Sequence, residues 1–370
     1  MRSSENNQGD RNMNSMLFSS LTIAGAICGY LIGGGFASGQ ELLQYFASYG
    51  LKGLGAVAVS FLIMVFCVVN FLTVGKKENI QNAHDAFTYY CGKKAGSFFE
   101  FIAFTYLIVQ VIVFFTGAGA TIAQGFDVSP FVGSAIMGVL VIITVMLGLR
   151  KLIDIVGSLG VLLVVMVIGI TGTFLLKNPS AIIEGSEQVA TMSNILQPSK
   201  NWAVSGFLYM TFNLLGLAAF MPLLGQKSES QSENVFGGVL GCVAFCGTIV
   251  LVMLAFLTDI GNVGTKLVPN LYLAQQLHPT LASFFSIVIL LGIYTGCALM
   301  YWNFCSRVVP ENSKYYKPFV IILGVFGIIF GSILPFDVAI NIIYQIYGYL
   351  GTLFLFFVIA KFFMKKKSGK

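Results

Sequence analysis

Hydrophobic residues are gathered in long unbroken runs along the chain, separated by short polar segments. A helix needs about 20 apolar residues to cross a bilayer core of about 30 Å. Ten runs of suitable length occur, at residues 17–49, 54–74, 97–125, 130–149, 152–176, 202–224, 235–260, 279–305, 318–334 and 338–363. The runs lack the alternation of barrel strands, and a helix satisfies its own backbone groups in lipid. The pattern predicts an all-α polytopic membrane protein with ten transmembrane helices.

The two halves of this pattern correspond to each other. A polar stretch with a short amphipathic segment follows the second run, at residues 75–96, and another follows the seventh, at residues 261–278. Each half has five runs, and because five is odd the second half enters the membrane from the opposite side. This arrangement is a 5+5 inverted repeat. We expect one transmembrane domain over residues 17–363, with repeats at about 17–176 and 202–363, a cytoplasmic tail at 1–16 and a basic tail at 364–370.

Composition and charge place the chain in a bilayer and orient it there. Hydrophobic residues make up 56% of the chain and charged residues 10%, which excludes an ordinary soluble enzyme. Of the 21 Lys and Arg residues, 17 fall on one side of the predicted membrane, and Lys52, Lys177, Lys200 and Lys266 fall on the other. The positive-inside rule then places both termini in the cytoplasm of a bacterial-type inner (plasma) membrane. The net charge of +6 is explained by topology, and a nucleic-acid partner is not expected.

The first run is too long for one straight crossing and is interrupted by glycine. Its 33 residues would form a helix of about 50 Å. Three consecutive residues in its middle each weaken a helix by about 1 kcal/mol relative to Ala, namely Gly33, Gly34 and Gly35. This pattern predicts an unwound segment and a new helix from about Phe36, whose N–H groups face an anionic group of the solute. The preceding carbonyls, from about Gly29 to Ile32, would face a cation. The alternative is a continuous, closely packed helix.

The sixth run is its counterpart in the second half, and it carries Asn213 and Gly216 near its middle. A break there would complete a site between the two halves. A hydrogen bond from Asn213 to a neighbouring helix is the alternative.

Glu41 is the one carboxylate deep inside a hydrophobic run. In a regular helix it would lie about 10 Å beyond the glycines, within the apolar half of the bilayer. A charge facing lipid there is costly, so Glu41 is expected to face the interior or a water-filled path, as a gate or as a proton or cation site. The alternative is a structural carboxylate at a helix start.

Two further sets of polar residues, on the third and eighth runs, are candidates for the site. Tyr106 and Gln110 are separated by four residues on the third run, so they share one helix face near mid-depth. Thr295 is a hydroxyl on the eighth run. Hydrogen bonding between helices is the alternative explanation for such residues.

The stretch Ile-Gly-Gly-Gly-Phe-Ala-Ser-Gly-Gln-Glu at residues 32–41, together with the ten-span plan, resembles the YkvI-type family of bacterial membrane proteins. This family is a branch of the amino acid-polyamine-organocation superfamily with a LeuT-like fold. The resemblance covers about residues 17–363 and implies a 5+5 inverted repeat, discontinuous helices one and six, and a central site for a small organic solute. By position, it implies the helix-one break at Gly33 to Gly35, the helix-six break near Asn213 to Gly216, and a solute-side tyrosine at Tyr106.

One position departs from the sodium-coupled members of this superfamily. Those members carry neighbouring hydroxyls on helix eight, whereas Thr295 is followed here by Gly296, Cys297 and Ala298. Proton coupling through Glu41 therefore competes with sodium coupling.

These patterns and the resemblance together predict a secondary transporter that moves a small organic solute, an amino acid or related amine, with H⁺ or Na⁺ coupling. A passive channel or a solute sensor on the same scaffold is the alternative. An enzyme is not expected, because the sequence has no recognisable nucleophile and base pair, and its seven cysteines lack metal-ligand spacing. No cofactor beyond a coupling ion is implied, and the sequence leaves the oligomeric state open.

Overall fold

The computed structural model describes residues 2–147 and 153–367, and this part of the chain consists of helices joined by turns and loops, the longest loop being residues 190–201. The longer helices are α1 (Arg2–Leu31), α4 (Gly53–Lys77), α5 (Ala83–Phe126), α6 (Pro130–Leu147), α7 (Ile153–Lys177), α9 (Trp202–Gln226), α10 (Gln231–Leu257), α13 (Pro279–Val308), α14 (Tyr316–Ile333) and α15 (Phe336–Lys367). The shorter ones are α2 (Gly34–Ser38), α3 (Gln40–Tyr45), the 3₁₀ helix η1 (Ala47–Lys52), α8 (Ala181–Val189), α11 (Ile260–Val263) and α12 (Pro269–Leu277). α8 was not predicted.

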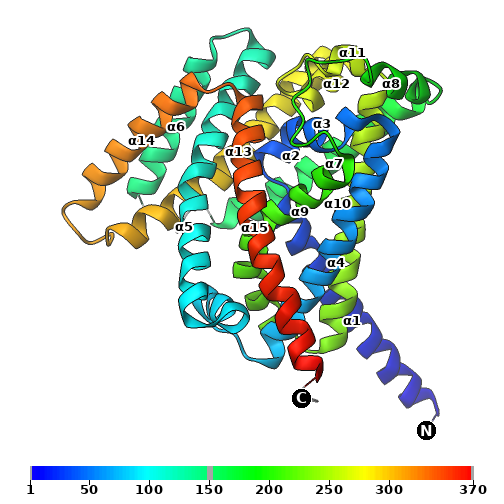
Figure 1. Ribbon diagram of the computed structural model, residues 1–370, viewed down its shortest axis with the longest axis vertical. Helices are drawn as coiled ribbons and strands as arrows, with labels where there is room; N and C mark the ends of the chain where they lie inside the picture. Colours follow the sequence, from blue (N-terminus) through cyan, green and yellow to red (C-terminus); the bar gives the residue numbers. More distant parts are fainter. Residues whose placement is uncertain (1, 148–152, 368–370) are drawn as a thin grey trace.

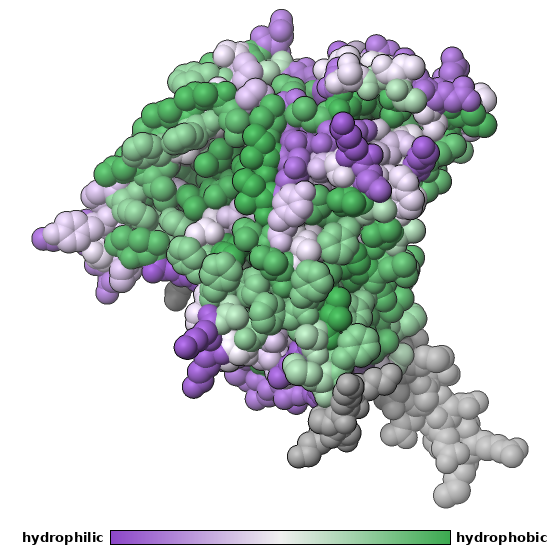
Figure 2. Space-filling model, in the orientation of Figure 1, coloured by the Kyte–Doolittle hydropathy of each residue, from purple (hydrophilic) through white to green (hydrophobic). Residues whose placement is uncertain are grey.

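Eight of the described helices are long and apolar enough to cross a membrane, or nine if the bent pair Leu162–Lys177 and Ala181–Val189 forms one span. The predicted count of ten is thus not confirmed. The first predicted run is divided into short pieces, of which Met16–Leu31 is the longest apolar helix. Residues 148–152, where the predicted fourth run ends and the fifth begins, lie outside the described residues. Figure 2 shows hydrophobic side chains over most of the middle of the visible face and hydrophilic ones at its upper and lower ends.

The first run is interrupted as predicted, but the break is shorter than expected, because Gly34 and Gly35 already belong to α2 rather than to an unwound segment before Phe36. α1 ends at Leu31, Gly33 is extended (φ −99°, ψ −168°), and α2 begins at Gly34. A second interruption follows at Gly39, whose φ of +85° lies in the left-handed region that glycine adopts without strain. Every residue of α2 and α3 is buried.

The predicted break in the sixth run is wrong, because α9 is one helix from Trp202 to Gln226. Asn213 bonds to its own helix, with Nδ2 donating to the carbonyl oxygen of Tyr209 at 3.0 Å. Gly216 instead allows α1 to approach α9 closely, because an added Cβ at Gly216 would collide with the hydroxyl of Tyr30. The helix therefore continues past Asn213 and Gly216, although Pro222 nearer its end has no N–H to donate, and the small residue at 216 provides space for α1.

The spans pack around α9, which contacts α4, α5 and α15, while α1 packs along α10. α6 and α14 lie side by side at one edge, against α5 (Figure 1). In the first half, Gly92, with φ of +72°, separates the first turns of α5 from its long span. In the second half, the short helix α12 directly precedes α13. The two predicted amphipathic inserts are therefore helices before the third and eighth runs. They lie at opposite ends of the molecule, the first at the lower end in Figure 1 and α12 at the upper.

Candidate functional site

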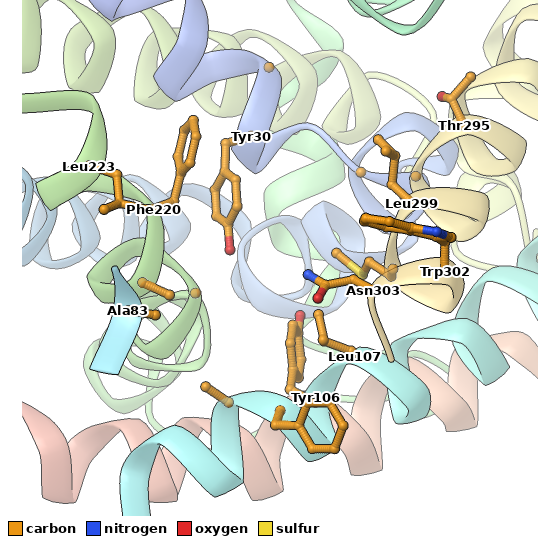
Figure 3. A pocket seen from close by; sticks show the side chains of 18 of the residues that line it. Tyr30, Ala83, Tyr106, Leu107, Phe220, Leu223, Thr295, Leu299, Trp302 and Asn303 are labelled. Atoms are coloured by element: carbon orange, nitrogen blue, oxygen red, sulfur yellow. The ribbon is translucent and has the colours of Figure 1, made fainter. Parts of the chain in front are cut away.

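A cavity of about 620 Å³ extends from the interrupted first run to one end of the molecule. Its lining comes from α1, α5, α9 and α13, and it reaches the extended backbone at Gly33. The side chains of Tyr30 and Tyr106 point into it, and the amide of Asn303 lies near the Tyr106 hydroxyl (Figure 3). The lining is mainly apolar and aromatic with a few polar groups, as in sites for small organic molecules.

A smaller cavity of about 50 Å³ contains most of the predicted polar residues. Glu41, Gln110 and Asn213 line it, together with Tyr106 and Gly216. Tyr106 and Gly216 also line the larger cavity, so the two spaces adjoin. The structure thus brings together side chains from the first, third and sixth predicted runs.

Glu41 is the acidic group of this small cavity, and it is 4% exposed. Its Oε1 atom accepts a hydrogen bond of 2.9 Å from the hydroxyl of Tyr209, and the hydroxyl of Tyr344 bonds to the same carboxyl group. The left-handed turn at Gly39 folds α3 back, so that Glu41 lies against Gly35. This overturns the estimate of about 10 Å beyond the glycines, which assumed one regular helix.

Gln110 completes the polar group and keeps one unused acceptor. Its Nε2 donates to the hydroxyl of Tyr344 at 3.1 Å, while its buried Oε1 has no hydrogen-bond partner. A buried acceptor without a partner is costly, so Oε1 of Gln110 is free to accept from a donor that enters this cavity. Glu41 and the Gln110 carbonyl therefore form a pair of hydrogen-bond acceptors.

Aromatic rings surround these acceptors. Phe212 stacks on Tyr344, with ring centroids 4.2 Å apart, and Tyr30 stacks on Phe220 at 4.9 Å. Tyr106 meets Tyr347 edge to face at 4.8 Å. Aromatic pairs in these geometries are favourable beyond the area they bury, so they stabilise the wall around the acceptors.

The candidate ion-coupling residues Gly29, Ile32 and Thr295 all line the larger cavity. The hydroxyl of Thr295 donates to the carbonyl of Gly292 at 3.0 Å, so its oxygen lone pairs stay available as acceptors. In the described part of the chain, no group of three or more His, Cys, Asp or Glu side chains is arranged to hold a metal ion.

Three predicted residues, Gly34, Gly35 and Phe36, line neither of these two cavities. A Cβ on Gly34 would lie 3.0 Å from both Phe114 and Ile293, and one on Gly35 would lie 2.8 Å from the Tyr344 hydroxyl. Phe36 packs against Phe245, with ring centroids 5.2 Å apart. These residues allow the close packing of α2 that positions Gly33 and Glu41.

The larger cavity is open at one end and closed at the other. Gln81, Asn82 and Arg307 line its outer part. At the other end, Asn270 of α12 donates to the carbonyl of Ala37 at 3.0 Å, and Gln44 of α3 donates to the carbonyl of Asp337 at 2.8 Å. These bonds hold α2 and α3 against α12 and α15.

Sequence reasoning missed Tyr209 and Tyr344. Tyr209 lies four residues before Asn213, so the helical face that carries Asn213 contains a signal for it. For Tyr344 there is no local signal, because its role depends on how α15 packs against α3.

Comparisons place this architecture among known proteins. No family model matches the chain. The structure matches the inward-facing conformation of Mhp1 with a TM-score of 0.58 at 10% identity, over 93% of this chain and 76% of Mhp1. It also matches a manganese transporter of Eremococcus coleocola with a TM-score of 0.51 at 14% identity, over 94% of this chain and 79% of that one. The fold is therefore that of the LeuT-like helical membrane proteins.

Two relatives come from Bacillus subtilis (strain 168). The uncharacterized membrane protein YkvI is 23% identical over 352 residues, which cover 92% of this chain and 95% of YkvI. The uncharacterized protein YyaD is 25% identical over 331 residues, covering 88% of this chain and 91% of YyaD. The chain is a multi-pass membrane protein and a homologue of YkvI over most of its length.

Proposed function

We propose that the protein is a secondary active transporter of a bacterial-type inner membrane, which moves a small organic solute by alternating access. The observation that carries this proposal is the cavity of about 620 Å³ that ends at the interrupted first run. In transporters built from inverted repeats, the solute binds at such a break near mid-membrane. The likeness in fold to Mhp1 and to a manganese transporter supports the class.

The solute that fits this site best is an amine, an amino acid among them. The polar group offers acceptors, namely the carboxyl group of Glu41 and the unpartnered Oε1 of Gln110. An ammonium group supplies donors for both and a positive charge for the carboxylate. The faces of Tyr30 and Tyr106 add cation–π attraction, and the apolar lining accommodates the carbon skeleton.

Two routes of ion coupling are open to this site. A proton on Glu41 would neutralise the carboxyl group and release the amine. A sodium ion would bind beside Thr295 and the backbone of Gly29 and Ile32, which share the larger cavity. The two routes predict different driving ions, so transport measurements separate them.

We propose ten spans in two repeats of five, at about residues 17–176 and 202–363. Packing between the halves is reciprocal: α1 packs on α10, and α9 packs on α4, so the first span of each half contacts the second span of the other. The position of the two inserts at opposite ends of the molecule supports the inversion (Figure 1).

The end of the molecule where α1 begins and α15 ends is proposed to be cytoplasmic (Figure 1). The excess of Lys and Arg in the loops supports this orientation. Because Arg307 and Gln81 line the outer part of the cavity, the structure would then be open to the cytoplasm.

Uptake into proteoliposomes tests the function. Purified protein is reconstituted, and a panel of radiolabelled amino acids and amines is offered under an imposed proton or sodium gradient. We expect saturable accumulation of at least one amine, driven by one of the two gradients. Accumulation under neither gradient would refute coupled transport. Downhill flux without saturation would indicate a channel, and binding without flux would indicate a sensor.

A further inference from the structure

A separate cavity of about 280 Å³ lies between the last turn of α4, the first turns of α5 and the last turns of α15. It shares no lining residue with the two central cavities. Three lysines from two helices converge on it: Lys77, Lys361 and Lys365. Tyr89 and Tyr90 form another wall. The cavity is therefore a basic pocket that the transport site does not use.

Two lysines of this basic pocket, Lys361 and Lys365, lie over the ring of Tyr89. The Nζ atom of Lys361 lies 4.8 Å from the centroid of the Tyr89 ring, and that of Lys365 lies 5.8 Å from it. Lys365 also forms an ion pair of 2.5 Å with Glu78. In the described part of the chain, Lys77 and Lys361 form no ion pair, so these two ammonium groups give the pocket positive charge. Two of the three cations are fixed over one ring, so little side-chain freedom is lost when an anion binds.

Neutral hydrogen-bonding groups complete the lining. Tyr90 donates to Oδ1 of Asn70 at 2.6 Å, which orients the Asn70 amide and leaves its Nδ2 group as a donor. The ammonium groups of the lysines and this amide are the donors that phosphate oxygens accept from.

The basic pocket lies at the edge of the apolar part of the molecule. Lys77 is the last residue of α4, and the candidate span in α15 ends at Lys365. Phe362 lines the pocket and is exposed, and the next two residues of α15, Phe363 and Met364, are also exposed apolar side chains. A ligand in the pocket would thus have its charged group among the lysines and an apolar surface next to it.

We propose that this basic pocket binds the phosphate group of an anionic lipid. Pockets of this kind between membrane helices bind lipid headgroups, and each lysine near the surface contributes about 1 kcal/mol of attraction. The exposed apolar residues of α15 would contact the acyl chains. A free phosphate ion shares the headgroup chemistry but gains nothing from that surface.

The test is a lipid titration of the purified full-length protein in neutral detergent. Mixed micelles with increasing dioleoylphosphatidylglycerol are compared with dioleoylphosphatidylcholine and with inorganic phosphate, and binding is read by native mass spectrometry and by the unfolding temperature. The pocket variant Lys77→Gln/Lys361→Gln is matched to Lys93→Gln/Lys94→Gln. The control removes the same charge from exposed lysines of α5 that do not line the pocket.

We expect phosphatidylglycerol to bind to the wild type more tightly than phosphatidylcholine does. The pocket variant should bind phosphatidylglycerol about 25-fold more weakly than the wild type, because each of its two lost lysines contributes about fivefold. The control variant should bind as the wild type does. Single Lys361→Gln, with an expected loss of about fivefold, serves if the double variant fails to fold.

These titrations distinguish a lipid site from a phosphate-ion site and from general surface charge. One result would be that inorganic phosphate raises the unfolding temperature of the wild type and of the control variant but not that of the pocket variant. That result would overturn the lipid proposal, because the pocket would then bind a soluble phosphate ion. Equal binding of the two lipids, or equal losses in the pocket and control variants, would overturn the proposal, because general surface charge would then explain the affinity.

Discussion

The hydroxyl of Tyr209 on α9 donates a hydrogen bond of 2.9 Å to Oε1 of Glu41 on α3. Tyr344 on α15 bonds to the same carboxyl group, so three helices meet at one buried acid. Any rearrangement that separates α9 or α15 from α3 acts directly on Glu41. Movement of either helix would therefore change the hydrogen bonds of this carboxyl group.

Tyr209→Phe removes one donor from Glu41 and keeps the ring. We expect a loss of about 1–3 kcal/mol in stability, because a buried carboxyl group is left with fewer partners, and a changed pH dependence of uptake. Tyr301→Phe is the matched control: Tyr301 is buried and donates to the carbonyl of Val320, away from both central cavities. The control should lose stability but keep the pH profile of uptake. Identical pH profiles for the wild type and Tyr209→Phe would contradict a link between this bond and coupling.

Glu41→Gln keeps the size of the side chain but cannot exchange a proton. Under the proton-coupling route, we expect uptake to lose its response to the proton gradient, while exchange of solute across the membrane persists. Loss of the negative charge should also weaken amine binding by about tenfold or more. Glu233→Gln is the control, since Glu233 is buried at the start of α10, where it accepts from the backbone N–H of Glu229 at 3.1 Å. Unchanged pH and ion dependence in Glu41→Gln would remove Glu41 from the coupling mechanism.

Gly34→Leu should abolish uptake while membrane insertion stays intact. Even a Cβ at this position would lie 3.0 Å from Phe114 and Ile293, so a larger side chain must displace α2. Gly25→Ala is the control, because no atom lies within 4 Å of the added Cβ and alanine favours the helix by about 1 kcal/mol. Uptake by both variants is compared at equal amounts of inserted protein. Normal uptake by Gly34→Leu would show that the conformation around the glycines is not needed.

Gln110→Met removes the unpartnered acceptor and keeps the length of the side chain. If Oε1 of Gln110 accepts from the ammonium group of the solute, the concentration for half-maximal uptake should rise by about tenfold. Gln226→Met, at the exposed end of α9, should leave it unchanged, because Gln226 donates only to Asn79 in the described hydrogen bonds. Equal affinities for Gln110→Met and the wild type would place the solute elsewhere in the larger cavity.

Thr295→Val replaces a hydroxyl on the cavity wall by a methyl group of similar size. Under the sodium-coupling route, the sodium concentration for half-maximal uptake should rise about tenfold, since one oxygen ligand is lost. The control is Thr248→Val on α10, whose hydroxyl bonds to the carbonyl of Ala244 at 2.9 Å and lines neither central cavity. A sodium dependence unaffected by Thr295→Val would exclude this hydroxyl as a ligand.

The break in the first run illustrates what local sequence determines. Three adjacent glycines weaken a helix wherever it packs, so the interruption at Ile32 and Gly33 was predictable from propensity alone. The sixth run shows the limit of such reasoning. Asn213 and Gly216 are compatible with a break, but they are equally compatible with a polar side chain bonded within its helix and a close contact to Tyr30. Only the packing against α1 distinguishes the two.

The sequence by itself determined that the chain lies in a lipid bilayer, approximately where its spans are, where glycine breaks the first run and which acid lies deep inside a span. These features follow from local sequence, because hydropathy and helix propensity act over neighbouring residues. Only the tertiary structure decided that α9 is continuous, that Gly39 turns Glu41 back against Gly35, and that Tyr209 and Tyr344 bond to it. The physical reason is that a buried carboxyl group takes its partners from whichever helices surround it, and those partners lie 168 residues away and more along the chain.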